Sequence, residues 1–192
     1  MSGSHADVPA AVRVRALEER LIDAGVITDD ELEEILAGVY ATASPVNGAR
    51  MVARAWADPA YRDRLLADGN AAAAELGFSG LSYLLKVVEN TADVHNVIVC
   101  TLCSCYPTSL LGPSPSWYKS FAYRSRVVRE PRPVLAEFGL ELPEQTEIRV
   151  WDANSETRYL VLPLPPGPAA GQDEDALAAQ VSRNGLIGTA VR

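Results

Sequence analysis

All three cysteines of this chain of 192 residues fall within six consecutive positions. They are Cys100, Cys103 and Cys105, in the stretch Val-Cys-Thr-Leu-Cys-Ser-Cys-Tyr-Pro. A C-x-x-C-x-C spacing brings three soft sulfur ligands within reach of one metal ion. An odd number of thiols also fits a metal site in a reducing compartment better than a disulfide framework. The spacing therefore predicts a metal-binding loop.

The middle of this motif allows a metal to bind main-chain nitrogen as well as sulfur. The sulfurs of Cys103 and Cys105, together with the backbone nitrogens of Ser104 and Cys105, close chelate rings of five and six atoms, which are unstrained. Proline at position 104 or 105 would remove an amide, and neither residue is proline. Cys100 would then be an axial ligand, with the sixth position open. Amide nitrogens lose protons only to a strongly Lewis-acidic ion, so this set favours trivalent cobalt or iron over zinc.

Two simpler sites compete with this interpretation. Three thiols also bind zinc, and an iron–sulfur cluster generally takes four protein ligands. His95 is the plausible fourth ligand, but it lies in a strand pattern, where we expect a structural, hydrogen-bonding histidine. The residues alone leave a catalytic metal and a zinc or iron–sulfur site open.

The composition is that of a globular protein and argues against nucleic acid and membrane as partners. A formal net charge of −8 is the opposite of the basic stripe that nucleic acid requires. No apolar run approaches the length of a membrane span, and no signal peptide opens the chain. We therefore expect a cytoplasmic protein.

Residues 1–80 show helical patterns with clear start signals. Thr28 and Glu31 form a capping box. Ser44-Pro45 and Asp58-Pro59 each place a capping residue before a proline at the first helical position. Few contacts are predictable for the amphipathic helices of the first 40 or so residues. We expect residues 1–80 to form a helical arm that embraces a partner chain.

From residue 81 the pattern changes to strands. Residues 84–89 and 94–99 are β-branched and apolar, and the second run leads directly into Cys100. Residues 147–151 and 158–162 flank an Asp-Ala-Asn-Ser turn, which predicts a β-hairpin.

Helices are expected near Trp117, after Pro131 and over residues 173–181. The predicted fold is α+β, with helical N-terminal segments followed by a layered α/β domain. That domain, residues 81–192, would carry the metal on a mixed or antiparallel sheet.

The cysteine stretch resembles the metal-binding signature of the nitrile hydratase α-subunit family. The resemblance continues, in the same order, over about the last two-thirds of the chain. Its further motifs are Trp117–Ser120, Tyr123–Arg132, Glu147–Asp152 and Arg158–Pro163.

This resemblance implies an enzyme that hydrates a nitrile to an amide at a non-corrin Co(III) or, less favoured, Fe(III) ion. Cobalt members are similar to this chain in carrying threonine after the first cysteine, here Thr101, with Trp117 downstream. Carried over, Cys100 is the axial thiolate, Cys103 a cysteine sulfinic acid and Cys105 a cysteine sulfenic acid. The metal-binding set is then Cys100, Cys103, Ser104 and Cys105, of which Cys103, Ser104 and Cys105 are also catalytic, and Trp117 lines the substrate pocket.

The resemblance also implies partners, namely one or more β-type subunits, a small nitrile and an activator protein that loads the metal. Two departures stand out. Thr108-Ser109 replaces the Trp-Pro that commonly follows Cys-Tyr-Pro, and Leu81 stands where the family usually has glutamine. They suggest an atypical member, such as the three-subunit toyocamycin nitrile hydratase.

Two alternatives stay open beside this interpretation. The closest is the metal-bearing subunit of a thiocyanate hydrolase. The other, from a different class, is a non-catalytic module in which the three thiols bind zinc and sense redox state.

Overall fold

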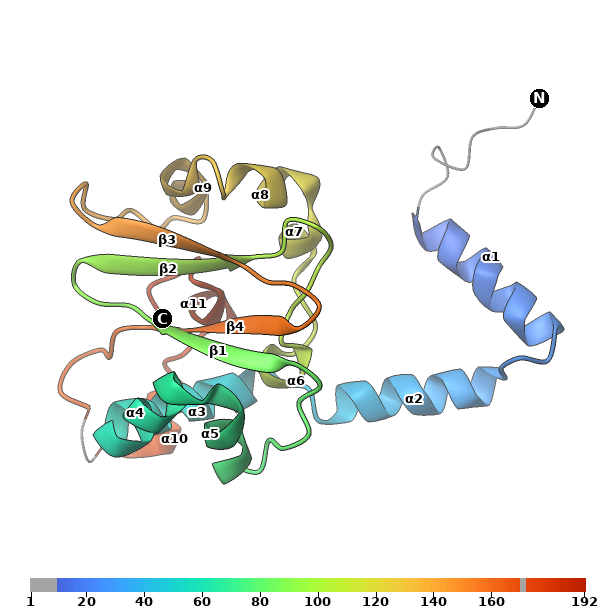
Figure 1. The fold of residues 1–192 in the computed structure, drawn as a ribbon, viewed down its shortest axis with the longest axis horizontal. Helices are drawn as coiled ribbons and strands as arrows, with labels where there is room; N and C mark the ends of the chain where they lie inside the picture. Colours follow the sequence, from blue (N-terminus) through green and yellow to red (C-terminus); the bar gives the residue numbers. More distant parts are fainter. Residues whose placement is uncertain (1–9, 170–171) are drawn as a thin grey trace. The chain divides into compact units, whose positions relative to one another are not determined.

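A computed structural model of the chain describes residues 10–169 and 172–192 (Figure 1). The chain divides into two compact units, one ending at Thr42 and the other running from Ala43 to Arg192. The helices over residues 45–75 thus belong to the same unit as the strands. The functional division into a partner-embracing arm, 1–80, and a catalytic domain, 81–192, stays a prediction.

The first unit contains α1 (Ala10–Asp23) and α2 (Asp29–Ala41). The capping box at the start of α2 is confirmed. Glu31 N donates to Thr28 Oγ1 at 3.2 Å, and Thr28 N donates to Glu31 Oε2 at 2.9 Å. Leu17 and Ile35 are 56% and 65% exposed, so both helices carry exposed apolar side chains.

The second unit begins with α3 (Pro45–Ala57), α4 (Pro59–Ala67) and α5 (Gly69–Glu75). Both predicted caps are present, because Ser44 Oγ accepts from Val46 N and Asp58 Oδ1 accepts from Ala60 N. These helices supply much of the hydrophobic core. Its fully buried members here include Met51, Val52, Tyr61, Leu65, Ala72 and Ala73.

Four strands follow, β1 (Leu84–Glu89), β2 (Val94–Val99), β3 (Glu147–Asp152) and β4 (Thr157–Leu162). β1 pairs with β4 and β2 pairs with β3, and both pairs are parallel. β2 also contacts β4, so the strands lie in the order β3, β2, β4, β1 (Figure 1). The α+β class is confirmed, but the expected mixed or antiparallel sheet is wrong, since each hydrogen-bonded pair is parallel.

The predicted β-hairpin is also wrong, because β3 and β4 pair with different strands. Ala153 N donates to Val99 O at 2.7 Å, which extends the β2–β3 ladder past the end of β3. Asn154 Oδ1 then accepts from Thr157 N at 2.9 Å and turns the chain into β4. Residues 97–99 and 160–162 are almost fully buried, which is the pattern of parallel strands covered on both faces.

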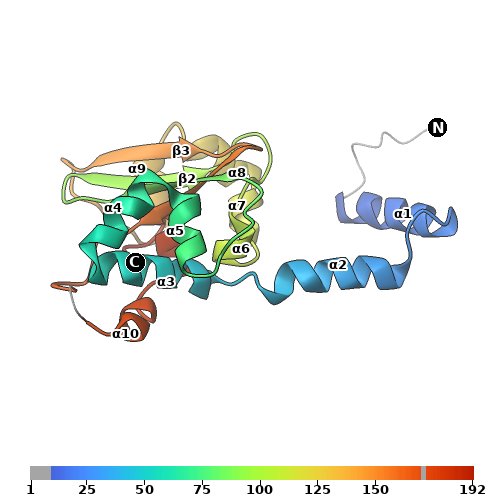
Figure 2. The same ribbon diagram turned by 60° about the horizontal axis from the view of Figure 1, so that its bottom comes forward.

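Short helices complete the second unit. They are α6 (Thr108–Leu111), α7 (Ser116–Lys119), α8 (Phe121–Arg126), α9 (Pro131–Glu137), α10 (Glu174–Ala178) and α11 (Arg183–Ile187). The strands lie between α8 and α9 on the β3 side and α3, α4 and α5 on the β1 side (Figures 1 and 2). The C-terminal helix prediction was too long, since α10 ends at Ala178 and α11 follows it.

Gly188 lets the end of α11 touch β2. Its φ is +90°, and a Cβ there would lie 2.0 Å from Asn96 O. Only glycine fits this approach. The contact fixes the C-terminal segment against the strand that leads to the cysteines.

Candidate metal centre

The cysteine loop, residues 100–105, begins where β2 ends. The Cys103 sulfur lies 3.4 Å from the Cys100 sulfur and 3.2 Å from the Cys105 sulfur. All three sulfurs lie within 4.8 Å of one another. Cys100 is buried, Cys105 is half-buried and Cys103 is exposed. The fold therefore gathers the three predicted sulfur ligands, with one at the base and one open to solvent.

Backbone amides of the same loop face these sulfurs. Cys103 N donates to Cys100 Sγ at 3.3 Å. The Cys103 sulfur accepts hydrogen bonds from the Cys105 and Cys100 thiols and from the backbone N–H groups of Ser104 and Cys105, which lower the pKa of Cys103 to about 7. Burial, followed by the neighbouring Cys103 and Cys100 sulfurs, raises the pKa of Cys105 to about 12. As the pH rises, Cys103 therefore becomes a thiolate before Cys105 does.

These residues fit a metal ion of the predicted kind. Three soft sulfur donors suit a transition metal and not magnesium or calcium. The backbone N–H groups of Ser104 and Cys105 also lie against the Cys103 sulfur, so the two proposed nitrogen ligands are close to the sulfurs. Within residues 10–169 and 172–192, no histidine or carboxylate joins the cluster.

A carboxylate and an arginine hold the loop from outside. Thr101 donates to Asp152 twice, from its N at 2.9 Å to Oδ1 and from its hydroxyl at 2.5 Å to Oδ2. Arg124 Nη1 donates to Cys103 O at 3.0 Å and to Thr101 O at 3.4 Å. The first half of the loop is therefore tied to the end of β3 and to α8.

Two buried tyrosines hold the backbone at both ends of the loop. Tyr123 OH donates to Ile98 O at 2.7 Å, two residues before the first cysteine. Tyr118 OH donates to Cys105 O at 2.9 Å. Both hydroxyls satisfy backbone carbonyls that would otherwise be costly to bury.

Trp117 packs in the aromatic cluster behind these tyrosines. Its ring centroid lies 4.9 Å from that of Tyr123 and 4.6 Å from that of Phe138, both edge to face. It lines a small cavity of about 140 Å³ to which no cysteine contributes. The predicted role of Trp117 in a substrate pocket stays a prediction.

Arg158 is a residue near the site that the sequence analysis did not single out. Its guanidinium packs over the Tyr83 ring at 5.4 Å from the centroid. Its positive charge also acts to lower the pKa of Cys105, against the net upward shift. Arg158 Nε and Nη1 are buried and have no partner among the described residues. The feature of the sequence that points to Arg158 is its positive charge at the start of the otherwise apolar run 158–162.

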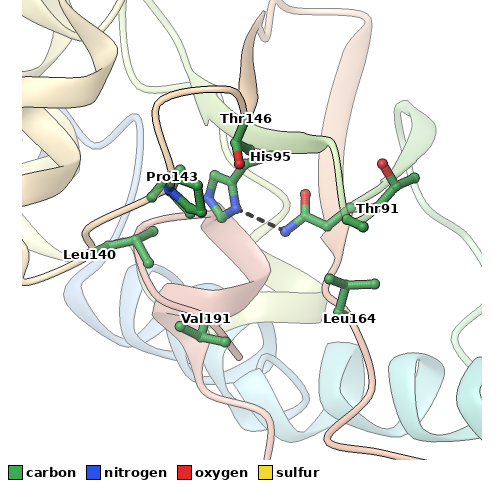
Figure 3. Close-up of a pocket in the computed structure, with 10 residues that line it drawn as sticks. Thr91, His95, Leu140, Pro143, Thr146, Leu164 and Val191 are labelled. Atoms are coloured by element: carbon green, nitrogen blue, oxygen red, sulfur yellow. Dashed lines mark hydrogen bonds between the residues drawn. The ribbon is translucent and has the colours of Figure 1, made fainter.

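His95 lies at the opposite end of β2 and does not join the cysteines. Five residues of extended strand, roughly 16 Å, separate it from Cys100. Its Nε2 donates to Gly188 O at 2.7 Å, and Asn90 Nδ2 lies 3.3 Å from its Nδ1, beside a cavity of about 200 Å³ (Figure 3). The prediction of a structural histidine is confirmed.

The two departures from the family pattern, Leu81 and Thr108-Ser109, both lie in the second unit. Leu81 is half-buried and packs against the hydrophobic core, so its side chain brings no polar group to the loop. Thr108 begins α6, and the next residue, Ser109, shares a hydrogen bond of 2.8 Å with Tyr83 OH.

The fold and the loop together define an α+β protein in which a buried strand leads into a loop that gathers three thiols within 4.8 Å of one another. A family model described as nitrile hydratase, alpha chain, matches residues 8–190. The chain belongs to this family.

Individual relatives agree with this assignment. The chain is 49% identical to the cobalt-containing nitrile hydratase subunit alpha of Pseudonocardia thermophila over 92% of its own length and 87% of that protein. It is 42% identical to thiocyanate hydrolase subunit gamma of Thiobacillus thioparus, over 94% and 77%.

A solved structure has the same fold. A double mutant of the Fe-type nitrile hydratase from Comamonas testosteroni superposes with a TM-score of 0.86 and 42% identity. The match covers 95% of this chain and 91% of that one. In the described part of the chain, no helix is long and apolar enough to cross a membrane.

Proposed function

We propose that this chain is the metal-bearing subunit of a nitrile hydratase, which adds water to a nitrile and forms the amide. The observation that carries the proposal is the cluster of three sulfurs within 4.8 Å of one another. The sulfurs of Cys100, Cys103 and Cys105 and the backbone nitrogens of Ser104 and Cys105 would hold the metal.

Cobalt is the proposed ion. Relatives at 47% and 49% identity are named as cobalt-containing nitrile hydratase subunits. The family resemblance associates threonine at this position with cobalt, and the Thr101 hydroxyl donates to Asp152 Oδ2 at 2.5 Å. Thr101 therefore acts on the loop conformation and is not itself a ligand.

A bound trivalent ion would supply the Lewis acidity that makes the nitrile carbon electrophilic. Cys100, which is buried, would anchor the ion from below, while the more exposed Cys103 and Cys105 leave room for substrate. Cys103 as sulfinate and Cys105 as sulfenate would place oxygen atoms beside the substrate. Water adds across the C≡N bond without C–N cleavage.

The first unit is proposed to embrace a β-type subunit. Exposed apolar side chains on α1 and α2, among them Leu17 and Ile35, would be covered in that complex. Two further apolar side chains are exposed, Leu102 in the cysteine loop at 85% and Phe121 at the start of α8 at 78%. An activator protein would load the metal in the cytoplasm, where the three thiols stay reduced until then.

Thiocyanate hydrolase is the second candidate. It is favoured by the gamma-subunit relative at 42% identity and by the apolar side chain of Leu81, where nitrile hydratases usually place glutamine. Its product from thiocyanate is carbonyl sulfide, which distinguishes it from an amide-forming enzyme.

The test is a product assay on the full chain co-produced with its partner subunit in cobalt-supplemented medium. Aliphatic nitriles and thiocyanate are supplied separately, and amide and carbonyl sulfide are quantified. Amide as the main product supports the first proposal, and carbonyl sulfide as the main product supports the second. A zinc-loaded protein that forms neither would identify a thiol sensor.

A further inference from the structure

The cationic side chain of Arg124 forms hydrogen bonds with the backbone of the cysteine loop. It lies on α8, and its Nη1 donates to Cys103 O at 3.0 Å and to Thr101 O at 3.4 Å. Both acceptors are main-chain carbonyls, so the contact does not depend on the sulfurs themselves.

The carbonyl of Cys103 and the amide of Ser104 belong to one planar peptide unit. The chain has no cis peptide bond among the described residues. In a trans peptide the C=O and N–H vectors point in opposite directions. A guanidinium that holds Cys103 O in place therefore also fixes the Ser104 N–H, which points in the opposite direction. That N–H is the one that contacts the Cys103 sulfur.

Other arginines of the same basic run are engaged differently. Arg126, two residues on, pairs with Glu130 and Glu137 at 2.5 and 2.6 Å. Arg132 donates to carbonyls of residues 142–146. Arg124 forms no ion pair with any carboxylate of the described residues, and its Nε is buried without a hydrogen-bond partner. Among the described residues, both hydrogen bonds of its side chain go to the cysteine loop.

We propose that Arg124 is a positioning residue that fixes the Cys103–Ser104 peptide so that the Ser104 nitrogen faces the Cys103 sulfur before any metal arrives. This inference rests on the proposed function for its consequence, which is metal uptake. The orientation of the peptide is a property of the chain alone. A charge-assisted hydrogen bond is about twice as strong as a neutral one, so it suits this purpose.

The test compares Arg124→Met, which keeps the aliphatic stem but has no donor, with Arg124→Lys, which keeps a cationic donor. Arg126→Gln is the matched control, because it removes a positive charge from the same helix without touching the loop. The solvent exchange rate of the Ser104 amide proton is measured by NMR on the metal-free full chain. Cobalt per chain is measured after production with the partner subunit in cobalt-supplemented medium.

In Arg124→Met we expect Ser104 exchange at least fivefold faster and cobalt occupancy at least fivefold lower. Arg126→Gln stays within twofold of the unaltered chain on both measures, and Arg124→Lys recovers most of the slow exchange. If Arg124→Met does not fold, the comparison of Arg124→Lys with the unaltered chain decides. Unchanged exchange and occupancy in a folded Arg124→Met chain would overturn the proposal, as would an Arg124→Lys chain that folds but exchanges at least fivefold faster.

Different results would contradict the proposed function and the proposed role of Arg124. An unaltered chain that takes up no cobalt would contradict the proposed function, while the exchange rates in the metal-free chain would still test Arg124. Normal cobalt uptake in both the unaltered chain and Arg124→Met would contradict only the role of Arg124.

Discussion

Asp152 accepts two hydrogen bonds from Thr101, one from the backbone N at 2.9 Å and one from the hydroxyl at 2.5 Å. Asp152 is the last residue of β3, and Thr101 directly follows the first cysteine. The parallel pairing of β2 with β3 is what brings them together, since Val99 is in register with Asp152. The sheet therefore sets the conformation of the cysteine loop directly.

Replacing Asp152 by Asn should loosen the loop. Asn keeps one oxygen that accepts from Thr101 N and offers an NH2 group to the Thr101 hydroxyl, so both hydrogen bonds lose the charged acceptor and are weakened. We expect the free energy of unfolding to fall by about 1 kcal/mol, measured by urea denaturation. Cobalt occupancy should fall as well. Thr101→Val removes only the hydroxyl bond and should have the smaller effect on both measures; a larger effect would mean that the backbone bond contributes little.

Tyr118→Phe removes only the hydroxyl that donates to Cys105 O. Tyr61→Phe is a matched control, because Tyr61 is also fully buried and its hydroxyl also donates to a backbone carbonyl, that of Ala72 at 3.0 Å. Each change should cost about 1 kcal/mol of stability. Only Tyr118→Phe should also lower cobalt occupancy. Equal cobalt loss in both variants would show that general stability, and not the bond to the loop, controls metal binding.

Cys105→Ala should abolish amide formation. The change removes one proposed sulfur ligand and the proposed sulfenate oxygen together, while the buried Cys100 stays in place. Turnover in steady-state assays is expected to fall at least a hundredfold, as is common when a catalytic group is lost. Near-normal turnover in a folded, metal-loaded variant would refute the assignment of Cys105.

Stability should depend on pH through His95. Burial lowers the pKa of His95 from 6.5, and its hydrogen bonds fit the neutral ring. The unfolded chain therefore binds a proton at a pH where the folded chain does not. The contribution of neutral His95 to the free energy of unfolding is fully present above about pH 6.5 and is lost as pH falls below that value.

Urea midpoints between about pH 7.5 and 5.5 are compared for the unaltered chain and His95→Gln, because Cys103, whose pKa is lowered to about 7, titrates in the same range in both chains, whereas carboxylates titrate mostly below it. His95→Gln should flatten the dependence. A slope that is unchanged in His95→Gln would assign it to other groups.

The sequence predicted the start of every strand to within one residue, because β-branched runs and Asx turns are local signals. The capping box at Thr28 and the caps at Ser44 and Asp58 were predicted for the same reason. Strand pairing was not, because it depends on Ala153 bonding to Val99, more than fifty residues away in the chain.

The difference between local signals and long-range contacts also applies to the metal centre. Its sulfurs are adjacent in the sequence and were predicted together. The groups that hold the loop come from elsewhere, with Asp152 at the end of β3 and Arg124 on α8. Arg158 was not predicted as part of the site, because a charged residue in an apolar strand does not by itself indicate which group it contacts. In the structure its guanidinium packs over the Tyr83 ring.

The central claim is that one loop binds a trivalent ion through sulfur and backbone nitrogen and carries oxidised cysteines. Elemental analysis combined with intact and peptide mass spectrometry of the purified complex tests it most directly. The account predicts one cobalt per chain and three added oxygen atoms, about 48 Da, on the peptide with Cys103 and Cys105. Stoichiometric zinc with three unmodified thiols would contradict it.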